Sequence, residues 1–158
     1  MASKWSRSTV VLLALLVSGL AISAASANRE GSASQATTRA TVKVAQSKPG
    51  RILADGRGRT LYLYPGETAS RIVCKADYLS CARLWPPFLT KGKPRAGQGV
   101  NARLLDTVRR TKPAGLQATY NRHPLYFFSA DAKAGDTSCQ AYYQLWYVVS
   151  PKGRAIKK

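Results

Sequence analysis

Residues 58–67 have the sequence GRTLYLYPGE, and residues 122–131 repeat this pattern as RHPLYFFSAD. In each copy a short aromatic strand ends at a turn, and an acid follows the first aromatic residue after four intervening positions. A tandem duplication explains this better than chance, and such units usually bury their apolar faces against each other. The copies align at Tyr62 and Tyr126, at Glu67 and Asp131, and, with a small slip, at Trp85 and Trp146.

The sequence around both copies is typical of strands and turns. Residues 52–64 and 116–128 each contain two extended runs around a turn, which predicts a hairpin in each. Residues 143–149, YQLWYVV, predict a further strand, and residues 104–111 are consistent with a strand or a short helix. The repeated strands are apolar on both faces, which indicates burial on both sides. We therefore expect an all-β fold with little helix, in which two tandem repeats pack around one core.

The N-terminus has the order of a secretory signal peptide. Lys4 and Arg7 precede an uncharged, largely apolar run over residues 10–22, and Ala25-Ser26-Ala27 follows as a cleavage site. The apolar run is shorter than the roughly 20 residues that span a bilayer, although an uncleaved anchor is the alternative. Cleavage is expected after Ala27. No lipid anchor is expected, because no cysteine precedes Cys74.

The rest of the chain reads as one domain. Residues 28–44 are rich in small polar residues and predict a flexible lead-in. The domain is expected over residues 45–158, with repeats at about 50–90 and 115–153. The exported protein would then be secreted or extracytoplasmic, in an oxidising compartment.

Cys74 and Cys81 are the natural disulfide pair, because they lie close in sequence in an exported chain. Cys139 is the odd cysteine. It could be a buried free thiol, the true partner of one of the other two, or the site of an intermolecular disulfide. The protein is therefore expected to be a monomer, or a dimer linked through Cys139. Zinc sites need paired Cys and His residues, and the chain has one His. No metal or cofactor is expected.

The chain carries 25 basic and seven acidic residues, a formal net charge of +18. Such charge favours anionic partners, which for an exported protein are envelope polymers, acidic glycans or a membrane surface. The basic residues are scattered without interleaved aromatic residues, so no specific nucleic-acid site is expected. The alternative is that the charge only keeps the protein soluble.

The chain resembles a family of secreted repeats, often described as predicted lipoproteins, with a Tyr-x4-Asp motif. The resemblance is carried by Tyr62-Leu-Tyr-Pro-Gly-Glu67 and Tyr126-Phe-Phe-Ser-Ala-Asp131, by residues 81–88 and 119–128, and by residues 134–153. It covers about residues 45–153 and implies a bacterial envelope or secreted protein of unestablished molecular function.

The chain departs from the family pattern at three points. It lacks the lipoprotein cysteine, Glu67 stands where the motif has Asp, and Cys139 stands where a small residue is expected. The first departure implies a freely secreted protein or one held by charge. The second makes an equivalent role for the two acids doubtful. The third, Cys139, makes a disulfide-linked dimer an alternative to a monomer.

The acids allow a structural and a chemical interpretation. Structurally, Glu67 and Asp131 each accept backbone N–H groups of the following loop, and each repeated Tyr hydroxyl finds a buried partner. Chemically, the two acids could hydrolyse an envelope polymer as acid and base, or Asp131 and Asp136 could contribute to a Ca²⁺ site. His123 is expected in a surface turn.

The tryptophans are expected to be structural. Trp85, followed by Pro86 and Pro87, is interpreted as a core anchor, with a carbohydrate platform as the alternative, and Trp146 as a core residue. We expect a non-catalytic exported module that engages anionic partners. The alternatives are an envelope-polymer hydrolase with paired carboxylates and a redox or metal-handling envelope protein.

Overall fold

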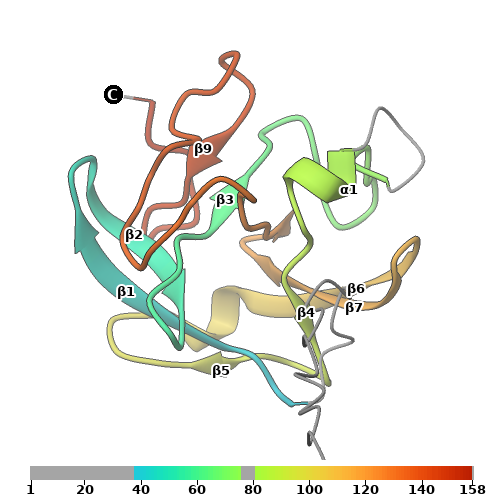
Figure 1. Cartoon of the computed structure of the whole chain (residues 1–158). Coiled ribbons are helices and arrows are strands. Elements are labelled where there is room, and N and C mark those ends of the chain that lie inside the picture. Colours follow the sequence, from blue (N-terminus) through green and yellow to red (C-terminus); the bar gives the residue numbers. More distant parts are fainter. Residues whose placement is uncertain (1–37, 76–80, 158) are drawn as a thin grey trace, which may run out of the picture. The chain divides into compact units, whose positions relative to one another are not determined.

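Figure 1 shows the computed structural model of the chain, which describes residues 38–75 and 81–157. The predicted signal peptide, the start of the lead-in and residues 76–80, between Cys74 and Cys81, lie outside the described residues. The expected all-β fold with little helix is confirmed. The elements are β1 (Thr41–Ser47), β2 (Gly50–Asp55), β3 (Tyr62–Leu63), α1 (Cys81–Leu84), β4 (Leu89–Thr90), β5 (Arg95–Ala96), a 3-10 turn (Ala102–Leu104), β6 (Leu105–Thr111), β7 (Ala114–Tyr120), β8 (His123–Pro124) and β9 (Tyr147–Val148).

The strands form several small sheets. One has the order β2-β1-β5, a second pairs β3 with β9, and a third has the order β4-β7-β6, with β8 also paired to β7. β1 and β5 run parallel, and the other strand pairs are antiparallel. No helix in the described part of the chain has the length and apolar character to cross a membrane.

The first strand begins earlier than the sequence suggested. β1 starts at Thr41, inside the segment assigned to the lead-in, because it pairs along its length with β2, from Val42 opposite Asp55 to Ser47 opposite Gly50. β5 adds to its other edge, in a basic stretch rich in Gly and Pro. Neither pairing of β1 can be read from local composition, because each depends on a partner strand elsewhere in the chain.

Both predicted hairpins are present. In the first, Ala54 pairs with Thr60, and the Leu61 N–H donates to the Leu53 carbonyl at 3.0 Å. In the second, β7 pairs with β8, and the Leu125 N–H donates to the Ala118 carbonyl at 3.0 Å. The same backbone layout therefore recurs in both copies of the repeated sequence.

The segment after each repeated Trp joins the hairpin of the other repeat. The Phe88 N–H, in the first repeat, donates to the Leu125 carbonyl at 2.9 Å, and the Val149 N–H, in the second, donates to the Leu61 carbonyl at 3.3 Å. In Figure 1, β9 accordingly lies beside β3, although most of the chain separates them in sequence. The two copies are interlocked, and each completes the sheet of the other.

The repeated strands are buried on both faces, as their composition predicted. One cluster of buried apolar side chains takes the leucines of these strands, and a second takes their tyrosines, because successive residues of a strand point to opposite faces. The first cluster includes Leu61, Leu63, Leu105, Tyr120, Leu125 and Val149. The second includes Ile52, Tyr62, Cys74, Trp85, Tyr126, Cys139, Trp146 and Val148.

The prediction of a strand over residues 143–149 is wrong except near its C-terminal end. β9 covers only Tyr147–Val148, and Ala141, Tyr143 and Gln144 have φ angles of 58°, 48° and 58°. These residues form tight turns in which the Gln144 N–H donates to the Ala141 carbonyl at 2.8 Å. The prediction over residues 104–111 resolves into β6 after a 3-10 turn.

Candidate functional site

The hydroxyls of the repeated tyrosines bind the acids across the repeats. Tyr62 Oη donates to Asp131 Oδ2 at 2.7 Å, and Tyr126 Oη donates to Glu67 Oε2 at 2.7 Å. Burial raises the pKa of both hydroxyls, and the neighbouring carboxylate raises it further. Both tyrosines therefore stay protonated and act as hydrogen-bond donors.

Glu67 is fully buried and its carboxylate is used by the protein itself. Oε1 accepts the backbone N–H groups of Val73 and Cys74 in the loop that follows it, each at 2.5 Å, and Oε2 accepts Tyr126. His123, expected in a surface turn, lies half-buried in β8 with Nδ1 at 2.7 Å from the Glu67 carbonyl. The surroundings of Glu67 therefore leave its carboxylate no contact with solvent.

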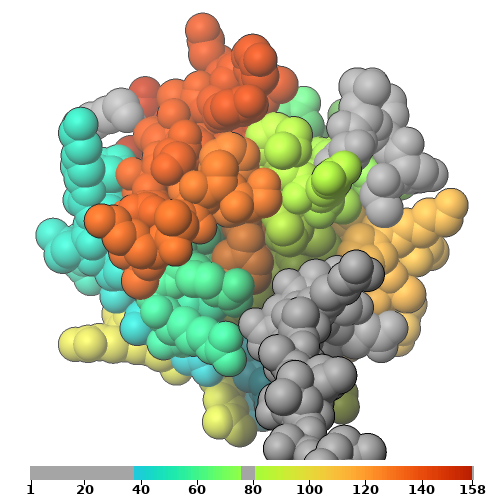
Figure 2. All heavy atoms as spheres, in the orientation of Figure 1, coloured from blue at the N-terminus to red at the C-terminus, as the bar shows by residue number. Residues whose placement is uncertain are grey.

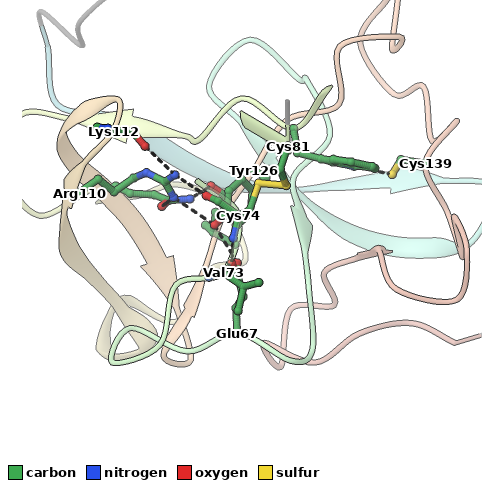
Figure 3. The surroundings of a disulfide bond; sticks show 11 residues. Glu67, Val73, Cys74, Cys81, Arg110, Lys112, Tyr126 and Cys139 are labelled. Carbon is green, nitrogen blue, oxygen red and sulfur yellow. Dashed lines mark hydrogen bonds between the residues drawn. A yellow bond between two sulfur atoms is a disulfide. The ribbon is translucent and has the colours of Figure 1, made fainter. Parts of the chain in front are cut away.

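Arg110 is a buried residue that sequence reasoning missed, and it shares two hydrogen-bond partners with Glu67, namely Tyr126 and Cys74. Its Nη1 donates to Gln117 Oε1 at 2.7 Å and to Tyr126 Oη at 3.2 Å, and its Nη2 donates to the Cys74 carbonyl at 2.5 Å. Figure 3 shows Arg110 and Glu67 approaching Tyr126 and Cys74 from different sides. The neighbouring Arg109 is exposed, so nothing in residue type distinguishes the two.

Asp131, the equivalent acid of the second repeat, is only half-buried. Its Oδ1 accepts the Ser138 N–H at 3.1 Å, and its Oδ2 accepts Tyr62. Partial burial raises the pKa of the Asp131 carboxyl, although the hydrogen bonds from Tyr62 and Ser138 lower it. Asp136 folds the same loop by accepting the N–H groups of Ala132 and Lys133 at 2.9 Å.

An open groove of about 320 Å³ lies between the first hairpin turn and the loop that carries Asp131. We call it the hairpin groove. In Figure 2, the orange segment after the second hairpin lies above the green segment of the first hairpin on the near face. The residues that line the groove include Arg57, Arg59, Pro86, Phe128, Asp131 and Lys133.

Arg59 is held in place at the edge of the hairpin groove. Its guanidinium lies over the Phe127 ring, 3.9 Å from the centroid. Its Nε and Nη2 each lie 2.9 Å from Asp55 Oδ2. Asp55 is itself buried and accepts the backbone N–H groups of Arg57 and Arg59 at 2.9 Å.

The acids in the described part of the chain share one role. All five accept backbone N–H groups, four of them from a neighbouring turn or loop and Asp106 from the next residue of β6. They are Asp55, Glu67, Asp106, Asp131 and Asp136. Most of the basic residues, in contrast, are exposed. The few negative charges therefore organise the backbone, and positive charge dominates the surface of the described residues.

The predicted disulfide between Cys74 and Cys81 is present. Cys139 is a free, fully buried thiol whose Sγ accepts Trp85 Nε1 at 3.0 Å. Burial raises the pKa of the Cys139 thiol to about 12. An intermolecular bridge through Cys139 would require this thiol to leave the interior.

Trp85 and Trp146 are buried and stack on each other, with ring centroids 4.5 Å apart and an interplanar angle of 5°. The repeated tryptophans thus meet at the same interface as the repeated tyrosines. Pro86 follows Trp85 and accepts the Phe127 N–H at 2.9 Å, and Pro87 pairs with Tyr126. Neither proline needs to donate a backbone N–H in these contacts.

Among the described residues, no three His, Cys, Asp or Glu side chains gather as a metal-binding group would. Asp131 and Asp136, which we considered as Ca²⁺ ligands, each accept at least two hydrogen bonds from protein donors instead. The carboxylate pair considered for hydrolysis also differs from a catalytic pair, since Glu67 is sealed in the interior.

Comparison with known proteins gives one match. A family model described as a secreted repeat of unknown function matches residues 108–150. Searches of curated proteins and of solved structures gave no match. The wider resemblance over residues 45–153 stays a prediction. Across residues 108–150, the resemblance to the family of secreted repeats of unknown function is confirmed.

Proposed function

We propose that the chain is an exported, non-catalytic binding module whose basic surface engages anionic polymers of the cell envelope or an anionic membrane surface. The proposal includes removal of the signal peptide after Ala27, which gives a secreted or extracytoplasmic domain. The description of the matching family as secreted supports the location.

One observation carries the proposal. All five described acids accept hydrogen bonds from backbone N–H groups, while the exposed basic residues greatly outnumber them. A surface of this kind attracts anions over long range and accelerates their association. Scattered charge suits a flexible polymer, whose repeating anions can meet several separate cations at once.

The rival hydrolase finds little support. A general acid or base must reach the substrate, and Glu67 is fully buried with three hydrogen bonds from protein groups. The Trp85 and Trp146 rings are stacked on each other inside the protein, which argues against a carbohydrate platform built on them.

Binding to immobilised polyglucuronate and to anionic phospholipid vesicles tests the proposal, with a neutral polysaccharide and zwitterionic vesicles as controls. We expect binding to at least one anionic surface and to neither neutral one. The affinity should fall about tenfold or more between low and physiological salt, because screening shortens the range of exposed charges. Salt-insensitive binding, or no binding to any anionic surface, would overturn the proposal.

A further inference from the structure

The two equivalent acids of the repeats differ in their surroundings, and the difference coincides with the hairpin groove. His123, the counterpart of Arg59, lies against the main chain of Glu67. Arg59 instead binds Asp55 and covers Phe127. One half is therefore closed around its acid, whereas the other leaves a groove lined by its acid.

The hairpin groove has the size and lining of a small-ligand site. Its volume of about 320 Å³ lies at the lower end of the roughly 300–1,000 Å³ that ligand pockets occupy. Pro86 and Phe128 supply apolar surface, as the C–H face of a sugar ring requires, while Arg59 covers the ring of Phe127. The volume suits one or two sugar units rather than a long segment of polymer.

Basic groups stand on both sides of the hairpin groove. Arg57 belongs to the hairpin turn and Lys133 to the opposite loop, and both are exposed. Arg59 also lines the groove and is held by Asp55, with its guanidinium over the Phe127 ring. A guanidinium has five N–H donors, and Asp55 engages Nε and Nη2, so the donors on Nη1 stay available to a carboxylate or phosphate.

Asp131 supplies acceptors in the same groove. The two carboxylate oxygens offer four lone-pair sites, and Asp131 accepts the Tyr62 hydroxyl, the Ser138 N–H and the Ser138 side chain. The remaining site can accept a hydroxyl group of a bound sugar. Since Tyr62 and Ser138 hold the carboxylate, it is oriented before the ligand arrives.

We propose that the hairpin groove binds a sugar unit that carries a carboxylate or a phosphate. The anion would meet Arg57, Arg59 and Lys133, the ring would pack on Pro86 and Phe128, and a hydroxyl would donate to Asp131. This proposal rests on the proposed function, because it names the unit of the anionic polymer that one place on the basic surface selects.

Titration with small probes at matched ionic strength tests the site on the full mature chain. The probes are glucuronic acid and glucose 1-phosphate, with glucose, acetate and inorganic phosphate as controls. We expect the better charged sugar to bind at least about tenfold more tightly than glucose and than its own anion alone. The stronger of the two charged sugars identifies the anion. Equal binding of the anions without sugar, or binding of neither charged sugar, would overturn the proposal.

A matched pair of variants localises the effect. Arg57→Ala with Lys133→Ala removes two charges from the hairpin groove, whereas Lys48→Ala with Arg154→Ala removes two exposed charges that do not line it. We expect the first pair to weaken charged-sugar binding about tenfold or more and the second pair by less than about twofold. Equal losses of charged-sugar affinity in the two pairs would contradict binding at the hairpin groove.

Amide chemical shifts of the unmodified protein provide a measurement that does not depend on any variant. Glucuronic acid should shift the amides of residues 57–60 and 129–134, and shifts confined to other regions would contradict the site. If the protein binds the polymer and the two double variants have the same affinity for the charged sugar, the proposed groove site is contradicted while the proposed function stands. Absence of polymer binding would remove the proposed function.

Discussion

Tyr62 and Tyr126 exchange both of their backbone hydrogen bonds, with the Tyr62 N–H 2.8 Å from the Tyr126 carbonyl and the Tyr126 N–H 3.0 Å from the Tyr62 carbonyl. Their hydroxyls then diverge, and each donates to the acid of the other repeat. Equivalent residues thus meet each other at the centre of the fold, and the motif joins the two repeats rather than serving each separately.

Removal of either hydroxyl should destabilise the fold unequally. Tyr126→Phe takes a donor from the fully buried Glu67 and a partner from Arg110, so we expect a loss of about 1–3 kcal/mol. Tyr62→Phe should cost less, because water can reach the half-buried Asp131. Urea unfolding measures both, and Tyr143→Phe, at an 80% exposed position, is the control. Equal and negligible losses would contradict this account.

A double-mutant cycle should show that the acid–tyrosine pairs cross the repeats. Tyr126→Phe and Glu67→Gln should be coupled by about 1 kcal/mol or more, as residues in direct contact are. Tyr126→Phe and Asp131→Asn should be nearly additive. Coupling of Tyr126 to Asp131 in place of Glu67 would mean that each repeat satisfies its own motif.

The raised pKa of Asp131 should make stability depend on pH. A carboxyl whose pKa is higher in the folded than in the unfolded protein holds its proton better when folded, so unfolding becomes easier as pH rises. Wild type should therefore lose stability relative to Asp131→Asn as pH rises from below the ordinary value of 3.8 to above the folded pKa. A difference that stays constant, or that changes in the opposite direction, would contradict the raised pKa.

The Cys139 thiol should resist modification in the folded protein. It is fully buried and its pKa is raised to about 12, so little thiolate is present or accessible near neutral pH. A thiol reagent at pH 8 should label one cysteine quickly in denaturant and slowly without it. The protein should run as a monomer on non-reducing gels. Rapid labelling of the folded protein, or a dimer that reduction removes, would place the thiol at the surface.

Local patterns predicted much of the fold. The repeat is visible when the sequence is aligned with itself, and both hairpins and the Cys74–Cys81 disulfide follow from residues close in sequence. The loop after each acid also binds that acid, as the chemistry of carboxylates in turns suggests. These features depend on short-range geometry, which sequence carries directly.

The long-range features were not predictable in the same way. Glu67 and Asp131 looked equivalent, and only the surroundings made by His123 and Arg59 separate them. Burial of Arg110 depends on Gln117 and the Cys74 carbonyl, which lies 36 positions away. The predicted strand over residues 143–149 failed because the chain turns tightly before the stacked Trp146.

Salt-dependent binding of wild type and the Glu67→Gln variant to polyglucuronate tests the central claim most directly, namely that the buried acid Glu67 stabilises the fold and the basic surface binds the polymer. Each variant is first shown to be folded by its far-UV spectrum and urea midpoint. We predict a lower midpoint for Glu67→Gln, and affinities within about twofold of wild type that fall in parallel with salt. A folded Glu67→Gln protein that no longer binds, or polymer cleavage by wild type that this variant lacks, would contradict it.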